Sequence, residues 1–137
     1  MKHILSFAFI FAAILLTACK PEAVVPAQST AVKEPISIFP DYTSVVIPPN
    51  IAPLNFMAKN QGEEFVARYA PRDGKREVVA AAAADGKLMF DSVAWRSLLT
   101  EARGSDIVLS LYSLRDNNWV KHPDATLTVA KEEIDPF

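Results

Sequence analysis

Cys19 has the most distinctive chemistry in the sequence, because it is the only cysteine in the 137 residues and lies in the stretch LLTACKPE. A thiol can act as a nucleophile, pair in a disulfide or pack as a small hydrophobe, but a single cysteine cannot close a disulfide within its own chain. Thirteen mainly apolar residues, 4–16, precede it after a short start with one fixed positive charge. A bilayer span needs about 20 helical residues, whereas ~7–15 suit the core of a secretory signal. The sequence therefore predicts an export signal that ends near Cys19.

The four residues Leu16-Thr17-Ala18-Cys19 resemble a bacterial lipobox: an aliphatic residue, a β-branched residue, a small residue and an invariant cysteine. The resemblance implies that the Cys19 sulfur takes a diacylglycerol, that the signal is cut between Ala18 and Cys19, and that the new amine is acylated. The alternatives are a general secretory signal with a chance cysteine, or an uncleaved anchor. Lipidation also avoids a free thiol in an oxidising compartment, and two or more acyl chains hold a protein firmly on a membrane.

Lys20 follows the candidate lipidation site. In lipoprotein sorting, an aspartate at this place favours retention in the inner membrane, and lysine departs from that pattern. The resemblance therefore implies a lipid-anchored protein of the bacterial cell envelope, at the outer membrane rather than the inner one. We expect its partners to be the membrane, through the lipid, and an envelope protein or glycan.

Few other residues predict catalysis. After cleavage His122 is the only histidine, so a zinc or copper site is not expected. The sequence lacks the Gly-x-Ser-x-Gly of a nucleophile elbow and any Gly-x-Gly that would cradle a phosphate. The stretch His122-Pro123-Asp124 is interpreted as the close of a strand. We expect no enzymatic activity, no metal and no cofactor apart from the covalent lipid on Cys19.

Two aromatic residues form a candidate ligand platform. Tyr112 and Trp119 flank the turn residues RDNN, so both lie on strands of one predicted hairpin. They could stack against a sugar ring, or they could pack against each other across the hairpin. We favour the second interpretation, cross-strand packing. Trp95 lies instead on the apolar face of a predicted helix and is expected in the core.

Composition and charge limit the remaining function classes. Loss of residues 1–18 removes one of the 14 basic residues, Lys2, and leaves 13 basic against 16 acidic side chains over 119 residues, a net charge of −3. The sequence has no basic stripe, so nucleic acid is not an expected partner. Residues 19–37 hold the lipidated cysteine and a proline-rich segment without apolar periodicity, which predicts a flexible tether. The alternative is that part of this segment packs on the domain. One domain, residues 38–137, is expected after it.

The domain is expected to be mainly β. Period-two alternation runs through residues 54–58, 65–69 and 107–112, and Asp-Gly pairs at 73–74 and 85–86 mark turns. The segment 91–104 predicts one short helix, because Trp95, Leu98, Leu99 and Ala102 recur at helical spacing. The predicted fold is an antiparallel immunoglobulin-like or fibronectin-like β-sandwich of about seven strands with this one helix.

The stretch FPDYTSVVIPPNIAPLNF, residues 39–56, resembles the start of a domain in envelope lipoproteins with TolB-like (PD40) β-propeller repeats. Weaker matches to the same group are the Trp-Leu-Leu helix at 95–99 and the Ile-Asp-Pro-Phe end at 134–137. The resemblance covers residues 39–137, and the propeller itself is absent from this sequence. Because Ile134 and Phe137 are large apolar residues at the end of the chain, we expect Phe137 to pack against a following domain of a longer protein. The alternative is that Phe137 folds back onto the sandwich and the protein is complete.

Three functions remain open from the sequence. The favoured one is a non-enzymatic, membrane-anchored envelope lipoprotein that acts as a protein-interaction or spacer module. The second is a carbohydrate-binding sandwich that uses Trp119 and Tyr112. The third is a hydrolase, which would require a convergent polar site around His122.

Overall fold

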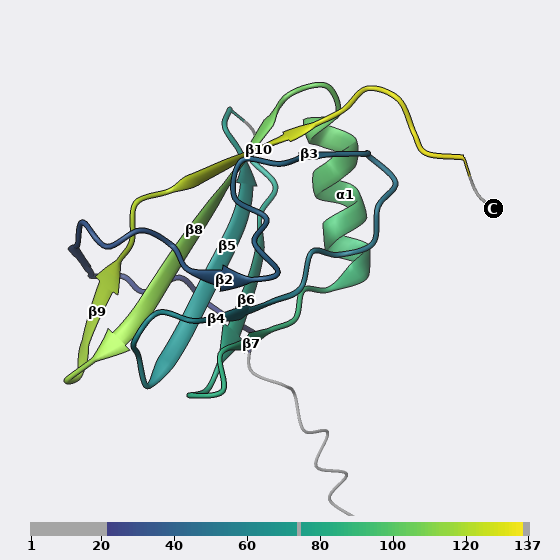
Figure 1. Cartoon of the computed structure of the whole chain (residues 1–137). Coiled ribbons are helices and arrows are strands. Elements are labelled where there is room, and N and C mark those ends of the chain that lie inside the picture. The colour runs from purple at the N-terminus through teal and green to yellow at the C-terminus, as the bar shows by residue number, and fades with distance from the viewer. Residues whose placement is uncertain (1–21, 74, 136–137) are drawn as a thin grey trace, which may run out of the picture.

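A computed structural model describes residues 22–73 and 75–135 (Figure 1). The described chain forms ten strands in two sheets and one helix. The strands are β1 (Thr30–Ala31), β2 (Ile38–Phe39), β3 (Val46–Ile47), β4 (Phe56–Ala58), β5 (Glu64–Pro71), β6 (Val78–Ala82), β7 (Lys87–Leu88), β8 (Asp106–Arg115), β9 (Asn118–Lys121) and β10 (Ala125–Val129). The helix, α1, spans Ser92–Ala102. The predicted mainly β fold with one short helix is confirmed.

Strand β8 is the centre of the seven-stranded sheet. Strand β5 pairs with it antiparallel along one edge, from Glu64 opposite Leu114 to Pro71 opposite Ile107. On the other edge, β9 pairs with its second half and β10 with its first half. The short strands β1 and β3 then join β9 and β10 in parallel, which departs from a purely antiparallel sandwich. Strands β2, β4 and β7 form the smaller antiparallel sheet.

The side-chain alternation of β8 defines an inner face of the large sheet. Ile107, Leu109 and Leu111 are fully buried on that face, next to Phe65 and Tyr69 of β5. Helix α1 and the small sheet cover this face, and the main hydrophobic core lies between the two layers (Figure 1). The period-two signal in the sequence therefore identified the core side of the central strands.

Helix α1 begins and ends where the sequence predicts. The carboxylate of Asp91 accepts the Ala94 amide at 2.8 Å and so caps the first turn. Four side chains face the core, and all are fully buried: Trp95, Leu98, Leu99 and Ala102. Gly104, with φ of 76°, follows the helix and turns the chain towards β8.

Aromatic rings join the helix to both sheets. The Tyr69 ring of β5 lies 4.8 Å from Phe90 and 5.1 Å from Trp95 between ring centroids, both edge-on, and Phe56 of β4 completes the cluster. The Trp95 indole donates to the Ile51 carbonyl at 3.0 Å, and the Tyr69 hydroxyl donates to the Leu54 carbonyl at 3.3 Å. Burial raises the pKa of Tyr69, so its hydroxyl keeps the proton that it donates.

The segment before β2 lies on the domain, unlike the flexible tether predicted for residues 19–37. Ala23 lies beside Val79 and Met89 at the edge strand β6, whereas Thr30 pairs with Val120 at the far side of the same sheet. Residues 22–37 are here called the strap, and their first part, residues 22–29, therefore crosses the outer face of the large sheet, as the dark purple segment does in Figure 1. Val66 and Tyr112, paired on that outer face, are only 5 % and 8 % exposed.

Two predicted features fall outside the described residues: the lipobox, including Ala18 and Cys19, and the terminal Phe137. Within residues 22–135, apart from residue 74, no helix has the length and apolar character required to cross a membrane.

The core position of Trp95 gives the first prediction. We expect Trp95→Ala to lower the free energy of unfolding by about 3–5 kcal/mol, because it removes a buried indole and leaves a cavity. Val93→Ala, on the exposed side of the same helix, should change it by less than ~0.5 kcal/mol. Urea unfolding followed by circular dichroism measures both. A Trp95→Ala cost similar to that of the Val93 control would contradict the core assignment.

Candidate functional site

The β8–β9 hairpin brings a serine and a histidine together. Its two-residue turn, Asp116-Asn117, has positive φ at both positions, 49° and 61°, as a tight hairpin turn of this kind requires. The resulting register places Ser113 opposite Val120. His122 directly follows β9, and its amide donates to the Leu111 carbonyl at 3.0 Å, so it closes the strand as predicted. Ser113 and His122 thus share the inner face of the hairpin.

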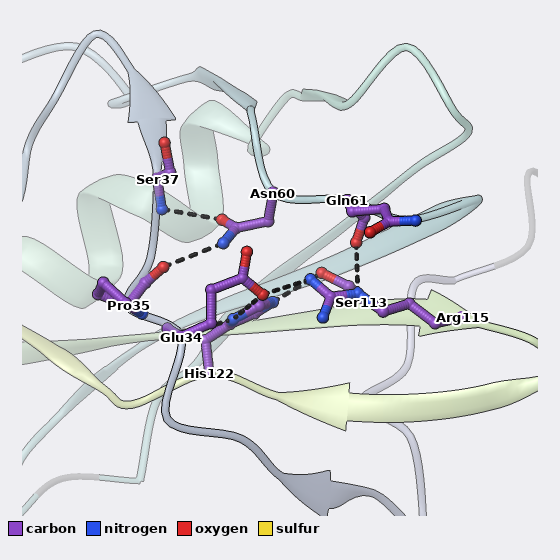
Figure 2. A network of polar contacts seen from close by, with 8 residues as sticks. All are labelled: Glu34, Pro35, Ser37, Asn60, Gln61, Ser113, Arg115 and His122. Carbon is purple, nitrogen blue, oxygen red and sulfur yellow. Dashed lines mark hydrogen bonds and ion pairs between the residues drawn. The ribbon is translucent and has the colours of Figure 1, made fainter.

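The imidazole of His122 joins the hairpin to the strap. Its Nε2 lies 2.8 Å from Ser113 Oγ, and its Nδ1 lies 2.9 Å from the backbone carbonyl oxygen of Glu34 (Figure 2). Because a carbonyl only accepts, Nδ1 must carry a proton and donate it to Glu34. In the neutral ring, Nε2 then accepts from the Ser113 hydroxyl. Both ring nitrogens are therefore satisfied inside the protein.

Charged and amide side chains complete this cluster at its exposed rim. Arg115 donates to the Glu34 carboxylate at 2.5 Å and to the Gln61 carbonyl at 2.7 Å. The hydrogen bond from the Arg115 guanidinium holds the pKa of Glu34 below its ordinary range. Asn60 accepts from the Ser37 amide and donates to the Pro35 carbonyl, so it fixes the strap just beyond Glu34 (Figure 2).

This constellation resembles a serine–histidine–acid site in composition but not in accessibility. Ser113 is fully buried and His122 is 1 % exposed, so a substrate cannot reach Ser113 Oγ while the strap is in place. The Glu34 carboxylate lies 3.9 Å from Nδ1, and the closer partner of that nitrogen is the backbone carbonyl. The geometry fits a structural connection that holds the strap to the hairpin.

His122 is a candidate from the sequence, but none of its partners is. Ser113 was detectable, since the two-residue turn fixes the hairpin register and places positions 113 and 122 on one face. Glu34 was not detectable as a partner, because it lies 88 residues from His122, in the segment that the sequence predicts to be a tether. Arg115 and Asn60 acquire their roles only once Glu34 is in place.

Of the two aromatic residues in the predicted platform, only Trp119 is accessible to a ligand in the structure. Tyr112 and Trp119 occupy the same outer face of the hairpin as diagonal neighbours, because Tyr112 pairs with Lys121 and Trp119 with Leu114. Tyr112 is buried, however, and cannot present its ring to a ligand. Trp119 is half-buried and lines an open groove of about 540 Å³. The other residues that line the groove are Pro26, Ala27, Gln28, Ser29, Thr30, Asn117 and Asn118.

In the part of the chain that the structure describes, no group of three or more histidine, cysteine, aspartate or glutamate side chains could hold a metal ion. No protein-family model, curated protein or solved structure matches the chain significantly. The resemblance to TolB-like propeller lipoproteins therefore stays a prediction from the residues alone.

The Glu34 ion pair predicts a dependence of stability on pH. Folding lowers the pKa of Glu34, so its contribution is present above the unfolded pKa of about 4.3 and is lost as the pH falls through the lower folded value. Glu34→Gln should therefore destabilise the protein at neutral pH, and the difference from the wild type should shrink at about pH 3. Urea midpoints at the two pH values measure this.

Glu63→Gln is the matched control, because it removes an exposed carboxylate from the turn before β5. The pH effect of Glu34→Gln should exceed that of this control. An equal difference between wild type and Glu34→Gln at both pH values would show that the ion pair does not stabilise the strap.

Proposed function

We propose that this chain is a lipid-anchored lipoprotein of the bacterial cell envelope, at the outer membrane rather than the inner one. Its domain acts as a non-enzymatic protein-interaction or spacer module. The observation that carries the proposal is the lipobox-like stretch Leu16-Thr17-Ala18-Cys19 directly after a thirteen-residue apolar core. In the described chain the strap meets the fold at Ala23, only four residues after Cys19. A lipid on Cys19 would thus be tied to a folded domain with little slack.

Two observations favour a binding or spacing role over catalysis. The one serine–histidine pair described above is buried and serves to hold the strap. Two large apolar side chains are instead exposed on edge strands, Phe39 of β2 at 67 % and Val46 of β3 at 70 %. Edge strands offer unpaired backbone groups to a partner, and exposed apolar residues add contact area there.

The anchor gives a direct test. The wild-type protein, expressed in a Gram-negative host, should incorporate labelled fatty acid and partition into the detergent phase of an extraction. Cys19→Ala should lose the label and the cut before residue 19, because no sulfur remains to be acylated. Intact mass spectrometry checks both. A mature wild-type protein that carries no lipid and partitions into the aqueous phase would overturn the proposal.

A carbohydrate-binding module is the second candidate, and the groove beside Trp119 favours it. A half-buried indole next to hydroxyl and amide side chains offers an apolar surface for a sugar ring and partners for its hydroxyl groups. The groove is closed on one side by the strap, so it exists only because residues 26–30 pack beside the hairpin. Tyr112 has no part in this version of the platform, because it is buried.

The glycan candidate is tested by retention on purified peptidoglycan and on an oligosaccharide array. If the groove binds sugar, Trp119→Ala and Gln28→Ala should each weaken binding, with Trp119→Ala losing about tenfold or more, equivalent to ~1.4 kcal/mol. Tyr112→Phe should bind as the wild type does, since the buried hydroxyl cannot contact a ligand. Equal retention of the wild type and Trp119→Ala would eliminate this candidate.

A further inference from the structure

We propose that the anchored domain rests directly on the lipid surface through an apolar patch formed by Ala23, Val24, Met89 and Val93, here called the seat. The proposal rests on lipidation of Cys19 under the proposed function and adds an orientation to it. The occupant of the seat is the headgroup layer of the bilayer that holds the lipid.

The first argument is the length of chain available. Only four residue steps separate Cys19 from Ala23, and an extended chain gains at most about 3.6 Å per residue, or ~14 Å in all. Ala23 lines one depression together with Met89 and Phe90. With the Cys19 sulfur bonded to a glycerol at the membrane surface, this end of the domain must stay within that distance of the bilayer.

The second argument is the chemistry of the surface at this end. Val24 is 72 % exposed, and Met89 and Val93 are each 68 % exposed. Ala23 and Met89 line one shallow depression at the edge of β6. Met89 and Val93 lie on either side of Asp91, the N-cap of α1. Val24, Met89 and Val93 are half of the exposed large apolar residues among those described, and each lies within two residues of a residue that lines this depression.

Charged groups around the seat limit its depth. The exposed Asp91 lines the same depression, and the exposed Glu22 and Lys87 lie within two residues of Ala23 and Met89 along the chain. Carboxylates do not enter the hydrocarbon layer without a large cost, so the seat contacts the headgroup and glycerol level only. Burial of Val24, Met89 and Val93 there contributes little compared with the acyl chains. The effect of the seat is to orient the domain, so that the face carrying these residues is directed towards the bilayer.

This orientation directs the other end of the domain away from the membrane. In Figure 1, β3 and the end of the described chain lie at the top, opposite β7 and the start of the strap. Val46 of β3 is as exposed as Met89, at 70 % against 68 %. It therefore serves as a matched reference position at the far end.

The test uses the mature lipoprotein in vesicles of phosphatidylethanolamine and phosphatidylglycerol. Because lipid occupies Cys19, a single introduced cysteine is the only free thiol and takes one fluorescent probe. We expect brominated lipids to quench probes on Met89→Cys and Val93→Cys at least threefold more than a probe on Val46→Cys. A second variant, Met89→Asp, should reduce quenching at Val93→Cys, whereas Val46→Asp should not.

The outcomes separate the seat from the anchor. Intact mass and flotation with the vesicles report lipidation, and quenching reports the position of the domain. Vesicle-bound, lipidated protein with equal quenching at positions 89, 93 and 46 would overturn the seat and leave the anchor intact. Protein that lacks lipid mass and does not float would overturn both.

Discussion

The structure depends on the two hydrogen bonds of His122, one to the Ser113 hydroxyl and one to the Glu34 carbonyl. A buried imidazole needs a partner for each nitrogen, and here one comes from β8 and the other from the strap. Removing either partner would leave a polar atom unsatisfied in the interior, at a cost of about 1–3 kcal/mol. The strap therefore cannot leave the hairpin without removing the hydrogen-bond partner of His122 Nδ1. No described side chain has a buried polar atom without a partner, which shows that the requirement is met.

Through this contact the strap joins both faces of the large sheet. Residues 22–29 lie across the outer face, Thr30 and Ala31 pair with the free edge of β9, and Ile38 and Phe39 enter the small sheet on the inner face. Glu34 and Ser37 lie at the point of passage, where Asn60 and His122 hold the backbone and Arg115 holds the Glu34 carboxylate. The strap also covers an edge strand that would otherwise present unpaired backbone groups. A segment that lacks its own core is thus ordered by backbone pairing and a few polar contacts.

The elements with local signals were predictable from the sequence, whereas the strap was not. The i, i+3, i+4, i+7 spacing of Trp95, Leu98, Leu99 and Ala102 determines which face of α1 is buried, and alternation does the same for β8. The strap has no such period, and the side chains that order it lie between 23 and 88 residues away along the chain. Only the aromatic ring of Trp119 indicated from the sequence that it could contact a ligand. The groove beside it could not be predicted, because the strap forms its other wall.

The packed strap changes what a lipid on Cys19 would do. A flexible segment of about 16 residues could let the domain move roughly 50 Å from the bilayer, whereas four residues allow ~14 Å. A domain of 100 residues has a radius of gyration of about 13 Å, so the short connection would keep the attached end of the domain within about one such radius of the membrane. An interaction surface at β3 could then meet only partners that reach this layer. Under this proposal, the position of Ala23 beside Val79 and Met89 sets how far from the membrane the protein can act.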